Sequence, residues 1–156
     1  ALPFILNVVD LQTSKNLRPE SVNYQMPLDI LYHSTNPENR PPNIDLTKGK
    51  HIIGYLSLTC PHCKIAAQKI SLMYRENPGL PIFLVLNGKV GLYEDYVKTY
   101  KLEAVPHVLF RGPNEYIKMA GANLPIFYWV NNGMVEQKGN GFQLTLYQIS
   151  TWLDRK

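Results

Sequence analysis

The motif Cys60-Pro61-His62-Cys63 limits the possible folds of this chain more than any other feature, because of what surrounds it. Residues 51–58 form a nearly continuous apolar run, which is typical of a strand buried on both faces. After the motif, apolar residues recur at helical spacing until a break at residues 77–79. The sequence therefore predicts a buried strand that leads through the motif directly into an amphipathic helix.

The predicted position of the motif gives its two thiols different roles. Cys60 falls at the N-cap of the helix and Pro61 at the first helical position, where proline is well tolerated. Unpaired backbone N–H groups and the positive end of the helix dipole stabilise a thiolate at Cys60. Cys63 lies one turn later, within reach of Cys60. His62 lies between them and can donate to the Cys60 sulfur or add positive charge. We expect Cys60 to attack and Cys63 to resolve the mixed disulfide.

The rest of the chain alternates between strand and helix signals. The early alternation implies right-handed crossovers and parallel strands, and a later Asn-Gly turn implies an antiparallel hairpin. We therefore predict an α/β fold with a mixed central β-sheet and helices on both faces. The expected strands are residues 28–32, 51–58, 80–86, 105–110, 124–130 and 134–138, and the expected helices are 61–76, 90–100, 115–120 and 144–153. Residues 33–50 are expected to form a loop.

Composition narrows the functional classes. Hydrophobic residues make up 45% of the 156 residues and charged residues 18%, as in a globular protein. The net charge of +4 comes from scattered Lys and Arg residues without a nucleic-acid motif, so we expect no nucleic-acid partner. No apolar run approaches the ~20 residues that span a bilayer. Because the chain begins at Ala1, we expect it to be processed, with any signal peptide or anchor outside it.

The two cysteines exclude two common structural uses of this residue. A disulfide-stapled scaffold needs several pairs along the chain, and a structural zinc site needs four ligands. The remaining histidines, His33, His51 and His107, lie far from the motif in sequence, and we expect them to be surface or packing residues. Tyr55 and Trp129 are near the predicted site, as is Tyr128, but the sequence assigns them no role.

Residues 56–64, with their CPHC motif, resemble the active-site segment of the thioredoxin superfamily. The Pro-His pair is similar to that of Dsb-type disulfide oxidases. Members of this superfamily place a cis-proline opposite the two thiols, at the start of the strand that leads into the hairpin. Residues 124–133 resemble that segment, including the Asn-Gly turn, so the resemblance assigns the cis-proline role to Pro125. Leu124 would then present backbone groups and an apolar contact to the substrate.

Pro81 and Pro106 compete for the same role, since both introduce apolar runs. An additional βα segment between the thiols and the cis-proline is characteristic of the TlpA/ResA-like branch, and residues 100–110 match it, which favours Pro125. The resemblance covers residues 25–156, the predicted thioredoxin-like domain, and leaves residues 1–24 as an N-terminal extension or tether. The first 24 residues could form an edge strand, a helix or a tether. Members of this branch are typically extracytoplasmic, so we expect a periplasmic location with a possible membrane tether.

Three positions depart from the family pattern. Thioredoxins usually have a buried acid where this chain has Gly54, and a tryptophan where it has Thr59. Leu124 occupies a position where Thr or Val is frequent. The acid relays a proton from the second thiol, so its absence leaves open both the direction of electron flow and the rate at which Cys63 is deprotonated.

The sequence therefore predicts a thiol–disulfide oxidoreductase that needs no cofactor beyond its own Cys60–Cys63 pair. Its expected partners are protein thiols or disulfides and a redox partner protein. A competing hypothesis is a soft-metal module in which Cys60, Cys63 and a histidine hold an ion such as Cu(I), although no third ligand is evident. A non-catalytic thioredoxin scaffold and a peroxidase are two further hypotheses, and the paired cysteines fit both less well than exchange.

Overall fold

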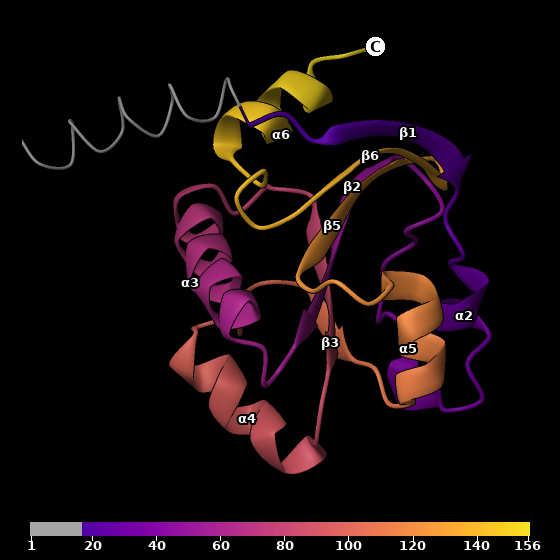
Figure 1. The fold of residues 1–156 in the computed structure, drawn as a ribbon, viewed down its shortest axis with the longest axis vertical. Coiled ribbons are helices and arrows are strands. Elements are labelled where there is room, and N and C mark those ends of the chain that lie inside the picture. The colour runs from indigo at the N-terminus through magenta and orange to yellow at the C-terminus, as the bar shows by residue number, and fades with distance from the viewer. Residues whose placement is uncertain (1–16) are drawn as a thin grey trace, which may run out of the picture.

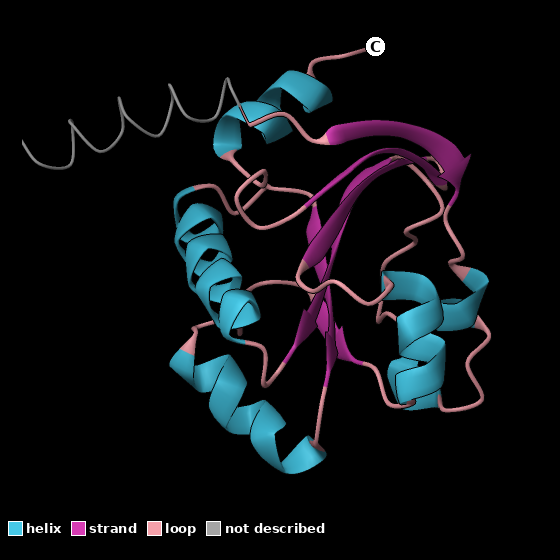
Figure 2. Ribbon diagram, in the orientation of Figure 1, coloured by secondary structure: helices cyan, strands magenta, loops and turns pink. Residues whose placement is uncertain are grey.

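A computed structural model describes residues 17–156 of the chain, which form a six-stranded sheet covered by helices on both faces (Figures 1 and 2). The predicted α/β architecture is thus confirmed. In chain order, the elements are β1 (Glu20–Gln25), α2 (Asp29–Tyr32), a 3-10 helix η1 (Pro37–Asn39), β2 (Lys50–Ser57), α3 (Pro61–Glu76), β3 (Ile82–Asn87), α4 (Val90–Thr99), β4 (His107–Leu109), α5 (Pro113–Ala120), β5 (Ile126–Asn131), β6 (Met134–Gly139) and α6 (Leu146–Leu153).

The strand order is β1-β6-β5-β2-β3-β4, with β2 near the middle of the sheet. β2 pairs in parallel with β3, and β3 in parallel with β4, as the intervening helices α3 and α4 require. β5 runs antiparallel to both β2 and β6. Asn132 and Gly133 form the turn of the β5–β6 hairpin with φ angles of 49° and 82°, the left-handed conformation that a tight hairpin favours.

The two faces of the sheet have separate hydrophobic cores. Helices α3, α4 and α6 pack on one face, and α2 and α5 on the other (Figure 2). Along β2, Ile52 and Leu56 belong to the first core, whereas Ile53 and Tyr55 belong to the second. This alternation explains why the strand is an almost unbroken apolar run. After β2 the chain continues through Cys60 into α3, which packs on the face of the first core.

One predicted strand is wrong. Residues 28–32 do not extend; instead the N–H groups of Leu31 and Tyr32 donate to the carbonyl of Leu28 and form the short helix α2. A run of five residues is too short for its apolar spacing to distinguish a helix from a strand. In the fold, residues 20–25 already occupy the edge position beside β6, and the one-turn helix lets Leu31 reach the core.

The beginning of the chain had three possible structures on sequence grounds. Residues 20–25 form the edge strand β1, which pairs antiparallel with β6. The prediction of a tether for the first residues falls largely on residues 1–16, which lie outside the described residues. Within residues 17–156, no helix combines the length and the apolar character that crossing a bilayer would require.

Candidate active site

Cys60 lies at the junction of β2 and α3, at the N-cap position predicted for it. Its backbone is extended (φ −78°, ψ 122°), and its sulfur accepts a hydrogen bond from the N–H of Cys63 at 3.3 Å. Pro61 begins the helix, where its missing N–H leaves no hydrogen bond unmade. The sulfur therefore accepts an N–H of the first helical turn at the positive end of the 16-residue helix α3.

Cys63 occupies a different environment one turn later. Its side chain is fully buried (0% exposed) in the core beneath α3, and its sulfur accepts a hydrogen bond from the N–H of Ser57 at 3.4 Å. Burial raises the pKa of the Cys63 thiol to about 12, and the adjacent Cys60 contributes in the same direction. Cys63 therefore keeps its proton at neutral pH in the reduced protein.

Pro125 forms the wall opposite the two thiols. The Leu124–Pro125 peptide bond is cis, as predicted, and it is the one cis bond found in residues 17–156, so Pro81 and Pro106 do not share this feature. The carbonyl of Leu124 accepts a hydrogen bond from the Cys60 thiol at 3.7 Å. A backbone acceptor from a distant part of the chain therefore faces the exposed sulfur.

The position that holds an acid in thioredoxins is filled by an aromatic ring. Gly54 pairs with Phe127 of β5 on one side and with Leu84 of β3 on the other. A Cβ at Gly54 would lie 2.5 Å from the ring of Phe127 and 3.0 Å from Leu84, closer than such atoms approach. The strand thus has no room for any side chain at residue 54, and the Phe127 ring occupies the space instead.

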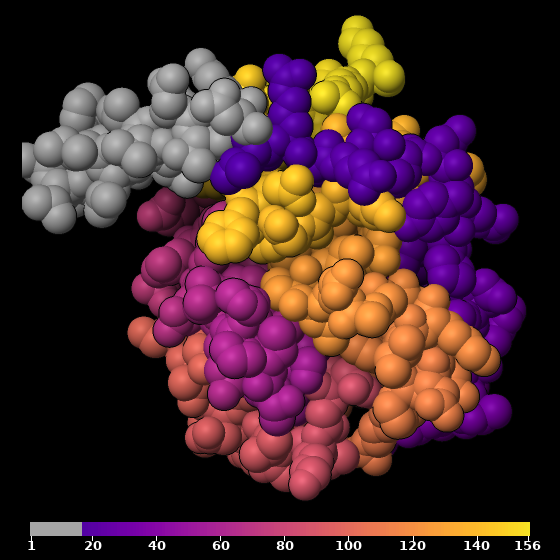
Figure 3. Space-filling view, viewed as in Figure 1, coloured from indigo at the N-terminus to yellow at the C-terminus, as the bar shows by residue number. Residues whose placement is uncertain are grey.

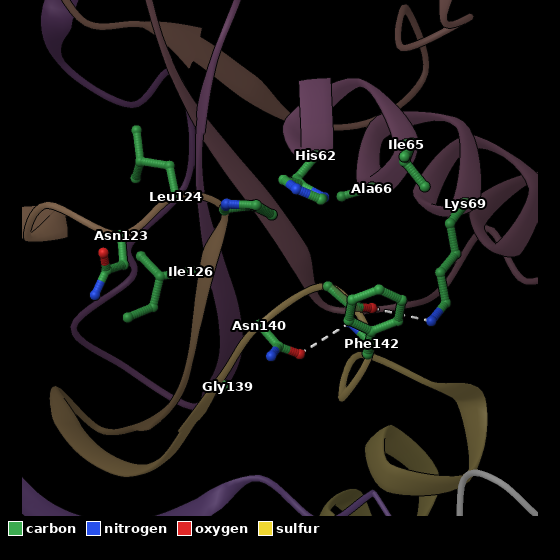
Figure 4. A pocket seen from close by; sticks show the side chains of 12 residues that line it. His62, Ile65, Ala66, Lys69, Asn123, Leu124, Ile126, Gly139, Asn140 and Phe142 are labelled. Carbon is green, nitrogen blue, oxygen red and sulfur yellow. Dashed lines mark hydrogen bonds between the residues drawn. The ribbon is translucent and has the colours of Figure 1, made fainter. Parts of the chain in front are cut away.

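A cavity of about 600 Å³ opens beside Pro125 (Figure 4). It lies between the first turns of α3 and two segments from the other end of the chain, residues 123–126 and the turn 139–142. Figure 3 shows the face on which these segments meet, and Figure 4 shows the lining side chains. They are His62, Ile65, Ala66, Lys69, Asn123, Leu124, Pro125, Ile126, Gly139, Asn140, Gly141 and Phe142.

His62 belongs to this lining. Its ring points into the cavity in Figure 4, and none of the hydrogen bonds found within residues 17–156 joins it to Cys60. The structure therefore brings His62 together with Leu124 and Pro125 in the lining of one cavity.

The other histidines are surface or packing residues, and the nearby aromatic residues are buried. His107 is half-buried and bonds Tyr93 at 2.6 Å and the carbonyl of Val105 at 2.7 Å, and His51 bonds the carbonyl of Lys48 at 2.7 Å. His33 is exposed. The remaining predicted neighbours of the site, Tyr55, Tyr128 and Trp129, are buried within the two cores.

Sequence reasoning missed the outer wall of the site. Residues 139–141 indicated only a strand break, and nothing in the sequence indicated that Phe142 lies across a cavity from α3. The copper hypothesis needed a third ligand beside the cysteines. In the part of the chain that is described, no group of three or more His, Cys, Asp or Glu side chains could hold a metal ion.

No known protein-family model matches the sequence, and no curated protein sequence matches it significantly. Solved structures do resemble the fold. StoA from Bacillus subtilis is 23% identical with a TM-score of 0.54, over 86% of this chain and 98% of that one. The thioredoxin domain of a thiol–disulfide oxidoreductase from Bacteroides vulgatus is 12% identical with a TM-score of 0.57, over 70% and 83%. A putative thiol:disulfide interchange protein DsbE from Chlorobium tepidum is 14% identical with a TM-score of 0.52, over 87% and 96%.

These likenesses confirm that the chain has the thioredoxin-like fold predicted from its sequence. Two of these structures carry names of the class that the CPHC motif indicated: the Bacteroides vulgatus domain belongs to a thiol–disulfide oxidoreductase, and the Chlorobium tepidum protein is a putative thiol:disulfide interchange protein.

Proposed function

We propose that this protein is a thiol–disulfide oxidoreductase that exchanges disulfides with protein substrates through Cys60 and Cys63. One observation carries the proposal: a partly exposed thiol at a helix N-terminus faces the Leu124 carbonyl beside a cis-proline, with a second, buried thiol one turn away. The structural likeness to a thiol–disulfide oxidoreductase domain and to a putative thiol:disulfide interchange protein supports it.

The exchange proceeds in two steps. The Cys60 thiolate attacks one sulfur of a substrate disulfide, a Cys60–substrate bond forms, and the other substrate sulfur leaves as a thiolate. Cys63 then gives up its proton to the departing thiolate or to water and attacks Cys60. The Cys60–Cys63 disulfide forms, the mixed disulfide breaks, and the substrate leaves with both sulfurs reduced. The same steps in reverse oxidise a substrate dithiol.

Leu124 and Pro125 are proposed to hold the substrate. The Leu124 carbonyl lies 3.7 Å from the Cys60 sulfur, so a peptide bonded to Cys60 would pass within hydrogen-bonding distance of this part of the backbone. His62 and Pro61 are proposed as parts of the catalytic motif, with Pro61 starting the helix and His62 at the mouth of the site.

The second step is proposed to be slow in this protein. Cys63 is fully buried with a pKa near 12, and Phe127 fills the place from which an acid would relay its proton. Slow resolution gives the mixed disulfide a long lifetime. The direction of net electron flow depends on the reduction potential of the Cys60–Cys63 pair relative to that of its partners.

The proposed location and partners are supported by the same likeness. Neighbouring structures include a secreted disulfide oxidoreductase from Mycobacterium tuberculosis and an exposed lipoprotein thioredoxin from Streptococcus pneumoniae. We place this protein outside the cytoplasm, with a possible tether beyond the described residues. Its partners would be protein substrates and a redox partner protein, with no cofactor beyond the two thiols.

Trapping the mixed disulfide tests the proposal. A Cys63→Ser variant incubated with a disulfide-containing peptide should accumulate a covalent Cys60–peptide adduct that mass spectrometry detects and a reductant removes. A Cys60→Ser variant is the matched control and should give none. Absence of an adduct in both variants, with no exchange by the unmodified protein, would refute the function. Equilibration with glutathione buffers would then give the reduction potential of the pair and separate an oxidase from a reductase.

A further inference from the structure

The backbone carbonyl of Cys63 accepts a hydrogen bond from a side chain outside its own helix. The hydroxyl of Tyr96, on α4, donates to this carbonyl at 3.5 Å. Tyr96 is 5% exposed, so the bond is buried in the first core, where α3 and α4 pack on the same face of the sheet (Figure 1). Among the hydrogen bonds found in residues 17–156, no other side chain outside the CPHC motif donates to an atom of the motif.

The ring of Tyr96 is held in place by its surroundings. It packs against the ring of Tyr100, with the two centroids 4.8 Å apart, and a side chain in a close-packed core has few other rotamers to adopt. Burial raises the pKa of the Tyr96 hydroxyl, and the nearby Cys63 raises it further. The hydroxyl therefore keeps its proton well above neutral pH and remains a hydrogen-bond donor.

The bond from Tyr96 is additional to the hydrogen bonds of the helix. In the regular pattern of α3, the Cys63 carbonyl pairs with the N–H of Ala67. A carbonyl oxygen has two lone pairs, so it can accept the hydroxyl as well. Phenylalanine at residue 96 would keep the ring, its packing and the helical bond, and would remove only the donor. This substitution therefore isolates what the hydroxyl contributes.

Cys63 receives little other polar support for the charge that it must carry during resolution. Its sulfur accepts the N–H of Ser57 at 3.4 Å, and the Phe127 ring fills the space beside Gly54 where thioredoxins usually have an acid. The thiolate of Cys63 forms in the same residue as a carbonyl whose oxygen carries a partial negative charge. A hydroxyl directed at that oxygen offsets the partial charge, and in a buried site this lowers the cost of forming the thiolate.

We infer that Tyr96 is a positioning residue for the second step of exchange: by donating to the Cys63 carbonyl, it ties the first turn of α3 to α4 and favours attack by Cys63. The inference rests on the proposed exchange function. In this step a bond forms between the sulfurs of Cys63 and Cys60, and the bond from Cys60 to the substrate breaks. The substrate sulfur leaves with the electron pair, and the Cys63 proton goes to that sulfur or to water. Tyr96 keeps its own proton throughout.

A symmetric aryl disulfide with a coloured thiolate separates the two steps in the reduced protein. The first aryl thiolate is released when Cys60 attacks, and the second when Cys63 resolves the mixed disulfide. The second phase does not depend on the concentration of the aryl disulfide, which identifies it in stopped-flow traces. We expect Tyr96→Phe to leave the first phase within about twofold and to slow the second about fivefold, the size expected for the loss of one hydrogen bond.

Tyr128→Phe is the matched control. Tyr128 is also buried, and its hydroxyl donates to the Ala120 carbonyl at 3.3 Å in the second core. This variant loses a comparable hydrogen bond that does not reach the motif, so both phases should stay within about twofold. Replacement of Tyr96 by para-aminophenylalanine keeps an N–H donor at the same place on the ring, and it should restore most of the second-phase rate.

The possible outcomes distinguish the inference from the exchange function. An unchanged second phase in Tyr96→Phe, with the first phase intact, would overturn the inference and leave the exchange function in place. Equal slowing in Tyr128→Phe, or no recovery with para-aminophenylalanine, would indicate a general effect on packing and would also overturn it. If the unmodified protein released no aryl thiolate, the exchange function itself would be refuted.

The carbonyl resonance of Cys63 in 13C NMR provides a second measurement that does not depend on activity. Because a hydrogen bond withdraws electron density from the carbonyl carbon, this resonance should move upfield in reduced Tyr96→Phe and stay in place in Tyr128→Phe. A resonance that did not move in Tyr96→Phe would show that the hydroxyl makes no bond to Cys63, and the inference would fall.

Discussion

The two thiols of the candidate active site are chemically identical, but Cys60 lies at its mouth and Cys63 in its interior, and their surroundings differ. At the mouth, Cys60 is partly exposed, receives an N–H from the helix and faces the Leu124 carbonyl. In the interior, Cys63 is fully buried and its pKa is raised to about 12. One helical turn separates the two residues. We expect this difference in depth to separate the roles of the two thiols in the proposed exchange, since depth controls both access and the cost of forming a thiolate.

The largest effect is expected when each cysteine is replaced in turn and the rate of disulfide exchange is measured. Cys60→Ser should lower the rate of exchange with a peptide disulfide by at least about 1,000-fold, because the attacking atom is lost. Cys63→Ser should keep the first attack and stop turnover at the mixed disulfide. Stopped-flow measurement of the first step distinguishes them. Equal loss of that step in both variants would show that the thiols are not specialised.

Alkylation tests the difference between Cys60 and Cys63 in the unmutated protein. At pH 8, a pKa raised from 9.0 to about 12 lowers the thiolate fraction of Cys63 by about 1,000-fold, and burial restricts access further. Iodoacetamide should therefore label Cys60 alone in the folded, reduced protein, as peptide mass spectrometry can measure. Labelling in guanidinium chloride is the control, where both should react. Rapid labelling of Cys63 in the folded protein would contradict the assignment.

The raised pKa of Cys63 also predicts how stability depends on pH. The unfolded chain releases this proton near pH 9, whereas the folded protein keeps it until about pH 12. The stabilisation that comes from keeping Cys63 protonated in the folded state is therefore fully present below pH 9. It decreases by a few kcal/mol as the pH rises toward 12. Urea unfolding of the reduced protein from pH 8 to pH 11 measures the loss. A Cys63→Ala variant should show a shallower decline, and an unchanged slope would be inconsistent with a buried, protonated Cys63.

The smallest expected effect is a change in stability on substitution of Gly54, which stands where thioredoxins usually have a buried acid. Gly54→Ala should destabilise the fold by about 1–3 kcal/mol, because the added Cβ would meet Phe127 at 2.5 Å in a packed sheet. Chemical denaturation measures this. A matched Gly79→Ala variant has open space around its Cβ and should cost less. If the two variants were equally stable, the Phe127 ring would not be the reason why residue 54 is glycine.

The sequence correctly predicted most elements because their signals are local. The residues around Cys60 specify a buried strand, an N-cap and an amphipathic helix without reference to the rest of the chain. The Asn132-Gly133 turn is similarly local. The helix over Asp29–Tyr32 was missed because its form depends on Leu31 reaching a core that the other elements create.

The thiol motif and its place at a helix N-terminus were therefore determined by the sequence alone, since adjacent residues supply the sulfurs and the N–H groups. Only the tertiary structure decided which residues from other parts of the chain surround the two thiols. The burial of Cys63, the ring of Phe127 at Gly54 and the Phe142 wall of the cavity all join segments that are distant in the chain. Such contacts depend on how helices and strands pack, and a linear pattern does not specify the atoms that will meet across a sheet.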